Sequence, residues 1–514
     1  VTRGIPRKSH CHLRIIEYPR LVISRIKNSS NYKWWIFATI AIGTFLSVVD
    51  HGSVLIALPS VESHFETDLP TVQWIVVGYA LAISVLILPM GRFGDMIGRK
   101  RVYVGGMVIF VITAFFAGAA PNLGFLIVAK IIQGVGSAMV QSSGIAMVVS
   151  SFPGTERGKA LGTHMSVVGT GAIAGPAIGG LLVSAFDWRA VFFANVPIGI
   201  VTIIISMLIL PLSKPDAPPE GQRFDWGGAI LSGLALLGFL LVVGNGDRLG
   251  WTSMAILSGA IATVVSGIAF VIWELISPSP MLEMRLFKRK IFGFGVAAGW
   301  FSFLGSSAAR FMMPFYLQRV LELSPRDVGF LLIPPAMCMV MLGPITGRLS
   351  DQFGWRVLTV GGLSLSAIAC FIMVFTLTEA SPELLIVIIL MAQSSGMALF
   401  NSPNNSSILS AVDRSQYGVV SALTQLVRNS ANVTSIAVST TVVVAVMGAK
   451  GVEPSLDAVT PDIADAFVEG LRYAFLMLGG LLLIGITFAL LRGERGKPIQ
   501  VPKAEPVEAK AETD

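Results

Sequence analysis

The chain has 514 residues, of which 54% are hydrophobic and only 13% are charged, and its mean hydropathy is +0.75. No soluble globular protein of this length needs so many apolar residues, so a soluble enzyme or binding domain is excluded. Apolar runs of about 20 residues, the length that crosses roughly 30 Å of hydrocarbon, recur along the chain, whereas the short alternating segments of a membrane β-barrel are not seen. The composition therefore predicts an all-α polytopic membrane protein.

Fourteen membrane-spanning helices are predicted from these apolar runs. They lie near residues 35–57, 72–90, 102–119, 123–145, 160–184, 190–211, 226–244, 255–276, 291–316, 326–346, 357–377, 384–403, 417–447 and 470–491. An even number of spans places both ends of the chain on one side of the membrane.

The distribution of Lys and Arg predicts which side this is. The eight segments on the side of the termini hold 28 basic residues, whereas the segments on the other side hold 6. Because cytoplasmic loops carry the excess of positive charge, both termini are predicted to be cytoplasmic, in a chain that lies in the plasma membrane. This bias accounts for the net charge of +7, which is therefore no sign of nucleic-acid binding.

The spans divide the chain into five parts. Residues 1–34 are predicted to be a basic cytoplasmic segment and not a signal peptide, because the apolar run that follows is too long and lacks a cleavage site. Residues 35–211 and 291–491 are predicted to form two six-helix bundles related by pseudo-twofold symmetry, with an inserted two-helix region at residues 212–290. Residues 492–514, rich in Pro, Lys and Glu, are predicted to be a disordered cytoplasmic tail.

An aspartate interrupts the first span, in FLSVVDHGSVLIALPS at residues 45–60. A buried carboxylate costs several kcal/mol unless it is paired or protonated. Asp50 lies eight residues from the predicted outer end at Leu58, and Lys130 lies eight residues inside the fourth span, which runs the opposite way. Both are thus about 12 Å deep, where they can pair. The pair is either the proton-coupling site of a transporter or a structural brace between two helices.

Two further ionisable residues bear on this site. His51, beside Asp50, either joins the proton path or is an ordinary hydrogen-bond partner. Glu274 lies near the cytoplasmic end of the eighth span, where it is expected to reach water, so Asp50 is the only carboxylate predicted deep in a span. The two inserted helices carry no charge at mid-depth and are not expected to take part directly in coupling.

Two cytoplasmic loops share one pattern, GRFGDMIGRKR at residues 91–101 and GRLSDQFGWR at residues 347–356. Four positions match at a constant offset of 256 residues: Gly91, Arg92, Asp95 and Gly98 with Gly347, Arg348, Asp351 and Gly354. The match predicts an internal duplication, and parallel repeats with a substrate site between them are a transporter architecture. Asp95 is predicted to cap a helix N-terminus and to pair with nearby cations as a latch; the alternative is that these cations only set topology.

Glycines four residues apart mark the fifth span, in GTGAIAGPAIGG at residues 169–180. Gly171, Gly175 and Gly179 fall on one helix face, where a neighbouring helix can approach closely, and Pro176 predicts a kink. The stretch is either a pivot or seal in alternating access or ordinary helix packing.

Two arginines lie inside spans of the second half, Arg310 and Arg428. Ionisable residues within a membrane are functional candidates by default. Arg310 lies nine residues from Arg319, so it either snorkels to the outer surface or forms a site for an anionic or zwitterionic group, including a lipid headgroup. Arg428 either braces the second half or attracts an anionic group.

Taken together, these stretches resemble the major facilitator superfamily, in its branch of 14-helix drug:proton antiporters. Three motifs carry the resemblance: the loop between helices 2 and 3 at Gly91, Asp95, Gly98, Arg99 and Lys100, the antiporter motif at Gly171, Gly175, Pro176, Gly179 and Gly180, and the helix 1 motif at residues 50–59. The chain departs from the superfamily at Phe93 and Met96. It also has Gly52 and Leu55 where the branch carries a hydroxyl residue and an asparagine.

The resemblance extends to the fourth helix. Lys130 stands where the superfamily's motif usually has an arginine, and Gln133 matches that motif. A lysine can lose its proton when desolvated, so coupling is expected to involve titration of the pair with Asp50. Gln133 becomes a candidate for substrate contact, together with Arg310 and Arg428.

The sequence therefore predicts a proton-coupled antiporter that exports amphipathic drugs or similar compounds by alternating access. The alternative on the same fold is an exporter of lipids, siderophores or other endogenous metabolites. An enzyme is disfavoured because the five histidines form no catalytic cluster, and a primary pump because no GxxxxGK[ST] phosphate loop occurs. No cofactor or metal is expected. The expected partners are protons, a small amphipathic substrate and the lipid bilayer, with no nucleic acid, and the chain is expected to be a monomer.

Overall fold

The computed structural model describes residue 29 and residues 31–67, 69–211, 224–323, 325–452 and 463–493. These residues contain helices and no strand, and 14 of the helical segments are long and apolar enough to cross a membrane, which confirms the predicted fold class. The helices are α2 (Tyr32–Phe65), α3 (Leu69–Val72), α4 (Trp74–Ile97), α5 (Arg99–Gly118), α6 (Leu123–Ser151), α7 (Arg157–Ala185), α8 (Trp188–Phe193), α9 (Asn195–Ile209), α10 (Trp226–Leu249), α11 (Met254–Ile276), α12 (Lys290–Phe315), α13 (Pro325–Phe353), α14 (Trp355–Thr376), α15 (Glu383–Ser410), α16 (Tyr417–Ala449) and α17 (Ala464–Leu491).

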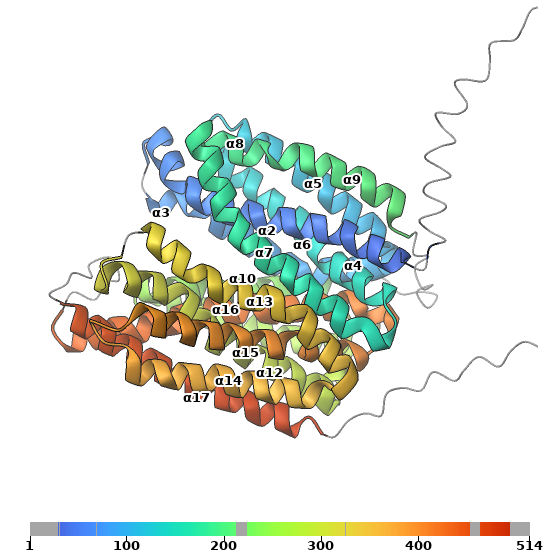
Figure 1. Ribbon diagram of the computed structural model, residues 1–514. Coiled ribbons are helices and arrows are strands. Elements are labelled where there is room, and N and C mark those ends of the chain that lie inside the picture. The colour runs from blue at the N-terminus through green and yellow to red at the C-terminus, as the bar shows by residue number, and fades with distance from the viewer. Residues whose placement is uncertain are drawn as a thin grey trace, which may run out of the picture.

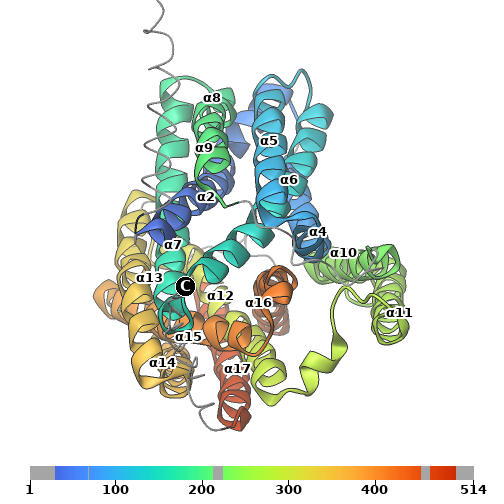
Figure 2. The same cartoon turned by 90° about the vertical axis from the view of Figure 1, so that its right-hand side faces the viewer.

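Two groups of helices lie side by side (Figure 1). Helices α2 to α9 form one group, the N bundle, and helices α12 to α17 form the other, the C bundle. Helices α10 and α11 pack against each other at the side of the molecule, and α10 contacts α4 and α16 (Figure 2). The inserted pair therefore touches both bundles without lying between them.

Several helices are longer than the predicted spans. The first span is predicted at residues 35–57, but α2 extends to Phe65 and includes Pro59. Asp50 is thus 15 residues, or about 22 Å along the helix axis, from the end of α2. The predicted span is shorter because hydropathy detects only the apolar part of a helix, whereas α2 continues through polar residues.

Both duplicated loops lie at the same end of the bundles, called the motif end. The start of α2 and the end of α17 lie at this end as well (Figure 1). In each loop one glycine joins two helices, with φ angles of 105° at Gly98 and 87° at Gly354. Such positive φ angles favour glycine over other residues. The turn between the two helices therefore explains why Gly98 and Gly354 are glycines.

Glu274 is buried, which contradicts its expected contact with water. The residue is 3% exposed, and its Oε2 accepts a hydrogen bond from the Leu282 amide at 3.1 Å. Residues 277–289 fold back over the end of α11, and the sequence pattern gave no signal for this. Glu274 Oε1 and Asp225 Oδ2 both lack a hydrogen-bond partner within the described part of the chain, and a Cβ on Gly228 would lie 2.5 Å from the first and 2.8 Å from the second. Two buried carboxyl groups therefore face each other at the base of the inserted helices.

Glu274→Gln is expected to raise the free energy of unfolding by about 1 kcal/mol. The amide removes the repulsion between two carboxylates and supplies a donor for the free oxygen of Asp225. Thermal unfolding of the purified protein in detergent measures the effect, with the exposed Glu283→Gln as a control that leaves the melting temperature unchanged. A lower melting temperature for Glu274→Gln would contradict the expectation.

The C bundle ends later than predicted, because Arg492 belongs to it rather than to a disordered tail. Arg492 is 1% exposed and donates hydrogen bonds of 2.7 Å to Asn404 Oδ1 and Ser407 Oγ. Most of the predicted tail, the predicted basic segment before α2 and part of the predicted inserted region lie outside the described residues.

Candidate functional site

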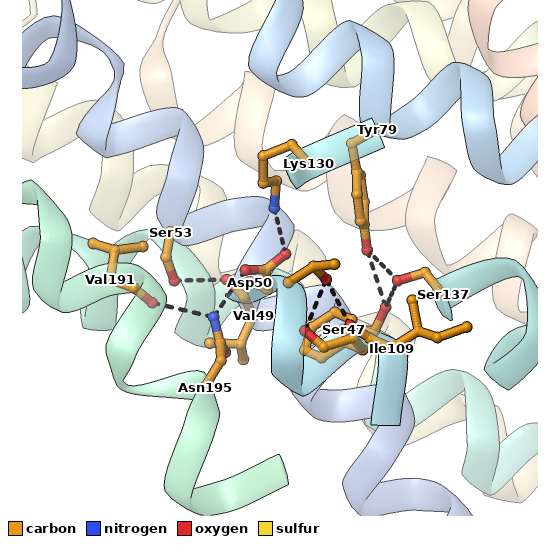
Figure 3. A network of polar contacts seen from close by, with 12 residues as sticks. Ser47, Val49, Asp50, Ser53, Tyr79, Ile109, Lys130, Ser137, Val191 and Asn195 are labelled. Atoms are coloured by element: carbon orange, nitrogen blue, oxygen red, sulfur yellow. Dashed lines mark hydrogen bonds and ion pairs between the residues drawn. The ribbon is translucent and has the colours of Figure 1, made fainter. Parts of the chain in front are cut away.

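Asp50 lies on α2 inside the N bundle and has no exposed surface. Lys130 Nζ of α6 lies 2.8 Å from its Oδ2, and the Asn195 amide of α9 donates to its Oδ1 at 2.8 Å (Figure 3). The pairing of Asp50 with Lys130 is as expected. Asn195 was missed, although a lone amide within an apolar span was a signal that could have found it. Three helices distant in sequence thus meet at one carboxylate, and both of its oxygens are paired.

Lys130 is 1% exposed and lies against aromatic rings as well as against the carboxylate. Its Nζ is 4.4 Å from the centroid of the Tyr79 ring and 5.7 Å from that of Phe192. Aromatic faces attract ammonium groups. Because a buried ion pair persists only where its geometry is good and its remaining hydrogen-bonding groups are satisfied, these rings and Asn195 help to hold the pair in a membrane helix bundle.

Hydroxyl groups extend this polar cluster toward the motif end (Figure 3). The Tyr79 hydroxyl lies 2.7 Å from Ser137 Oγ and 3.2 Å from Ser47 Oγ, and the two serine oxygens are 3.3 Å apart. Ser47 is one turn from Asp50 on α2, and Ser137 is two turns from Lys130 on α6. The Asp50 cluster therefore combines a titratable ion pair with a chain of groups that can both donate and accept protons.

Two other predicted residues lie beside the Asp50 cluster. The half-buried His51 ring stacks on Tyr79 with centroids 6.0 Å apart, and no hydrogen bond joins His51 to Asp50 within the described part of the chain. Gln133 is fully buried on α6, one turn from Lys130, and among the residues that the structure describes neither of its amide atoms has a hydrogen-bond partner. In this conformation Gln133 offers no surface to a substrate.

The predicted close approach of α7 to another helix is present, and the neighbour is α2 beside Asp50. Cβ atoms on Gly171, Gly175 and Gly179 would lie 3.0, 3.1 and 2.6 Å from atoms of α2. Ser53 Oγ of α2 also donates to the Gly175 carbonyl at 3.1 Å. Gly180 faces open space, so it takes no part in this contact.

Gly179→Ala is expected to lower the free energy of unfolding by about 1–3 kcal/mol. The added methyl group would meet the α2 backbone at Ser53 and push α7 away from it. Gly180→Ala is the matched control and is expected to be neutral or slightly stabilising, because alanine favours helices over glycine. Thermal unfolding in one detergent compares the two, and equal melting temperatures would contradict the packing argument.

Pro176, for which a kink is predicted, lies within the continuous helix α7.

The Asp95 carboxylate reaches from the N bundle to the C bundle at the motif end. Its Oδ1 accepts from the Gly418 amide at 3.2 Å, and its Oδ2 accepts from the Val419 amide at 3.1 Å. Arg99 Nε of α5 donates to Oδ1 at 2.9 Å. The two amides belong to the first turn of α16, where free N–H groups and the helix dipole favour negative charge. The predicted cap and ion pair are thus both present, and the capped helix belongs to the opposite bundle.

Asp351, the equivalent residue in the repeat, makes the reciprocal contact. Its Oδ1 accepts from the Gly158 amide at 3.0 Å and its Oδ2 accepts from the Lys159 amide at 3.1 Å, in the first turn of α7. Each bundle therefore caps one helix of the other. The contacts of Asp95 on α16 and of Asp351 on α7 are called the two latches below.

The other residues of the two repeated loops have different structural roles. Cβ atoms on Gly91 and Gly347 would lie 2.7 and 2.1 Å from a backbone oxygen of the opposite bundle, so these glycines let the bundles meet. Lys100 Nζ donates to the Leu210 carbonyl at 2.7 Å and thus joins the start of α5 to the end of α9. Arg348 is exposed.

Arg310 and Arg428 lie on neighbouring helices of the C bundle. Arg310 Nη2 of α12 lies 3.5 Å from Ser307 Oγ, one turn back toward the motif end, so the side chain does not point to the outer surface as a snorkelling residue would. Ser307 Oγ in turn donates to Asn432 Oδ1 of α16. Arg428 is half-buried and lies one turn before Asn432.

Among the residues that the structure describes, no three His, Cys, Asp or Glu side chains lie together in a way that could hold a metal ion.

Comparisons with known proteins agree with this architecture. Residues 40–436 match the family model of the Major Facilitator Superfamily. The riboflavin transporter RibZ of Clostridioides difficile is 31% identical over 397 residues, which cover 77% of this chain and 85% of that protein. The multidrug resistance protein Stp of Mycobacterium tuberculosis is 27% identical over 423 residues, which cover 82% of this chain and 78% of that protein.

The fold is also shared with a solved structure. The proton:xylose symporter XylE superposes with a TM-score of 0.62 over 89% of this chain and 95% of that chain, at 13% sequence identity. At such low identity the likeness concerns the fold alone. The match to the family model covers most of the chain, and it agrees with the helical architecture and the paired motifs at one end of the bundles. The chain belongs to the major facilitator superfamily and is a multi-pass membrane transporter, not an enzyme.

Proposed function

We propose that this transporter is a proton-coupled antiporter that exports small amphipathic organic compounds by alternating access, with Asp50 as the group that carries the proton. The observation that supports it most is a fully buried carboxylate with Lys130 Nζ at 2.8 Å. Ionisable groups inside membrane helices are costly and mark proton relays and substrate paths. A carboxylate whose charge is balanced by one ammonium group changes its surroundings strongly when it binds a proton.

Protonation of Asp50 removes the attraction that holds Lys130. The Lys130 ammonium group then keeps its contact with the Tyr79 ring but has no counter-charge. This favours a rearrangement of α2 against α6. Because lysine, unlike arginine, can lose a proton when desolvated, Lys130 is included with Asp50 in the proposed coupling site. A proton that moves through 100 mV supplies about 2.3 kcal/mol to such a cycle.

Helix α7 is the structural connection between Asp50 and the contact of the two bundles. Its middle packs on α2 through Gly171, Gly175 and Gly179, and its first turn receives Asp351 from α13. A displacement of α2 on protonation would therefore press on the helix that one latch holds. Alternating access would consist of release of both latches and closure of the bundles at the opposite end.

The orientation is also part of the proposal. The distribution of Lys and Arg places the motif end and both termini in the cytoplasm and the chain in the plasma membrane. In that orientation the present conformation is closed toward the cytoplasm, since both latches are formed there. We propose a monomer as the working unit, because one chain supplies both bundles and both latches.

A second candidate on the same fold is an exporter of an endogenous metabolite, such as a lipid or a siderophore. The two relatives are named for different substrates, one for riboflavin and one for multidrug resistance. Arg310 and Arg428 favour this candidate, because two cations within the spans suit an acidic compound better than a lipophilic cation.

Inverted vesicles with an acidified lumen test the proposal. An exporter is expected to move amphipathic dyes into the lumen while protons leave it, and an uncoupler is expected to stop both fluxes. Dye uptake that persists after the proton gradient has collapsed would overturn proton coupling. Movement of a labelled lipid without any dye uptake would favour the second candidate.

A further inference from the structure

Arg310 lies on α12 and Arg428 lies on α16, and these two helices pack against each other. Residues 302–309 of α12 are all buried, whereas Arg310 directly after them is exposed. Arg310 lies beside Ser307, and Ser307 is hydrogen-bonded to Asn432 of α16, one turn from Arg428. The two arginines therefore belong to one site rather than to two separate surfaces.

This helix pair also borders the N bundle. Helix α16, which carries Arg428, packs against α4 and α6. Arg310 and Arg428, called the arginine site below, thus lie on two packed helices of the C bundle, one of which contacts the N bundle.

The arginine site has no counter-charge. Neither arginine forms an ion pair within the described part of the chain. The buried carboxylate of Asp50 is already paired with Lys130 and Asn195 inside the N bundle. An ionisable residue inside a membrane span is costly, so two guanidinium groups linked through Ser307 and Asn432 indicate a position that an anion occupies for part of the transport cycle.

We propose that the arginine site binds the acidic group of the transported compound, so that the substrates are organic anions rather than lipophilic cations. This inference rests on the proposed exporter function and names its substrate class. A carboxylate or sulfonate accepts two parallel hydrogen bonds from one guanidinium group, and each such bond is charge-assisted. A cationic drug would instead meet two repelling charges on the C bundle and an aspartate already paired with lysine on the N bundle.

Two dyes of the same shape and opposite charge test the substrate class. Fluorescein is an anion and rhodamine 123 is a cation at neutral pH, and both contain the xanthene ring system. Binding to the purified full-length protein is measured by fluorescence anisotropy in neutral detergent. Fluorescein is expected to bind at least about tenfold more tightly than rhodamine 123. Arg310→Gln and Arg428→Gln are each expected to weaken fluorescein binding about tenfold. Arg428→Lys keeps the positive charge and is expected to lose less affinity for fluorescein.

Arg319→Gln is the matched control, since it removes an exposed cation on the continuation of α12 and is expected to leave binding unchanged. Melting temperatures within the wild-type range show that each variant is folded. Tighter binding of rhodamine 123, or fluorescein binding unchanged in both glutamine variants, would overturn the inference. Proton-driven uptake of rhodamine 123 in vesicles would refute the substrate class but leave the antiporter intact. Selective fluorescein binding without proton-driven flux would support the substrate class and overturn the antiporter.

Discussion

Asp50→Asn is expected to abolish proton-driven transport while the protein still inserts into the membrane. Asparagine keeps the size of the side chain and an oxygen for Lys130, but it cannot take up a proton. The change also leaves a buried ammonium group without a counter-charge, which is expected to lower the free energy of unfolding by about 3–5 kcal/mol. Flux of substrate and protons in inverted vesicles measures the first effect, and thermal unfolding in detergent measures the second.

A double variant separates coupling from bracing. Asp50→Asn together with Lys130→Met removes both charges, and replacement of a buried ion pair by groups without charge is often neutral for stability. The double variant is therefore expected to recover most of the lost stability but none of the proton-driven flux. Lys130→Met alone is expected to be unstable, because it leaves the carboxylate unpaired. Proton-driven accumulation of substrate by a folded double variant would show that the pair is only a brace.

Asp95→Asn and Asp351→Asn are expected to open the motif end. Each carboxylate accepts two backbone hydrogen bonds from the first turn of a helix in the other bundle. A hydrogen bond to a charged group contributes about 1.5–3 kcal/mol, so loss of one latch is expected to shift the population of the closed state by roughly tenfold or more. Because the two latches are separate, the double variant is expected to shift it further than either single change.

Pulsed electron paramagnetic resonance measures this opening. Spin labels at the exposed positions Arg101 of α5 and Val357 of α14 report the distance between the bundles near the motif end. The short distance is expected to lose population in Asp95→Asn and more so in the double variant. Asp465→Asn, which removes an exposed carboxylate far from the latches, is expected to leave the distribution unchanged. An unaltered distribution in the double variant would show that the latches do not hold the closed state.

The helices and the polar sites within them could be predicted from the sequence because both depend on local pattern. A membrane helix must satisfy its backbone internally and carry about 20 apolar residues, so each span is visible in a short stretch of sequence. Asp50, Lys130, Arg310 and Arg428 stand out for the same reason, because a charge is conspicuous in such a stretch. The pairing of Asp50 with Lys130 followed from their similar depth along two antiparallel helices.

Partners from other helices could not be predicted. Asn195 and Tyr79 complete the surroundings of the ion pair, yet nothing in their own spans shows which helix they contact. Glu274 is buried because residues 277–289 fold back over it, which no periodicity reveals. The repeated loops showed that Asp95 and Asp351 are equivalent, but not that each caps a helix of the opposite bundle.

The sequence by itself determined that the chain has fourteen apolar stretches long enough to cross a membrane, that its two halves share a motif, and which side chains bear charge inside the spans. These properties can be predicted because hydrocarbon is a poor solvent for charged groups and for backbone groups without hydrogen bonds. Only the tertiary structure decided which charges are neutralised and which are not. Asp50 is paired with Lys130 and Asn195, whereas Arg310 and Arg428 form no ion pair among the described residues. Charge compensation depends on which helices are neighbours, and that is set by packing across the whole chain.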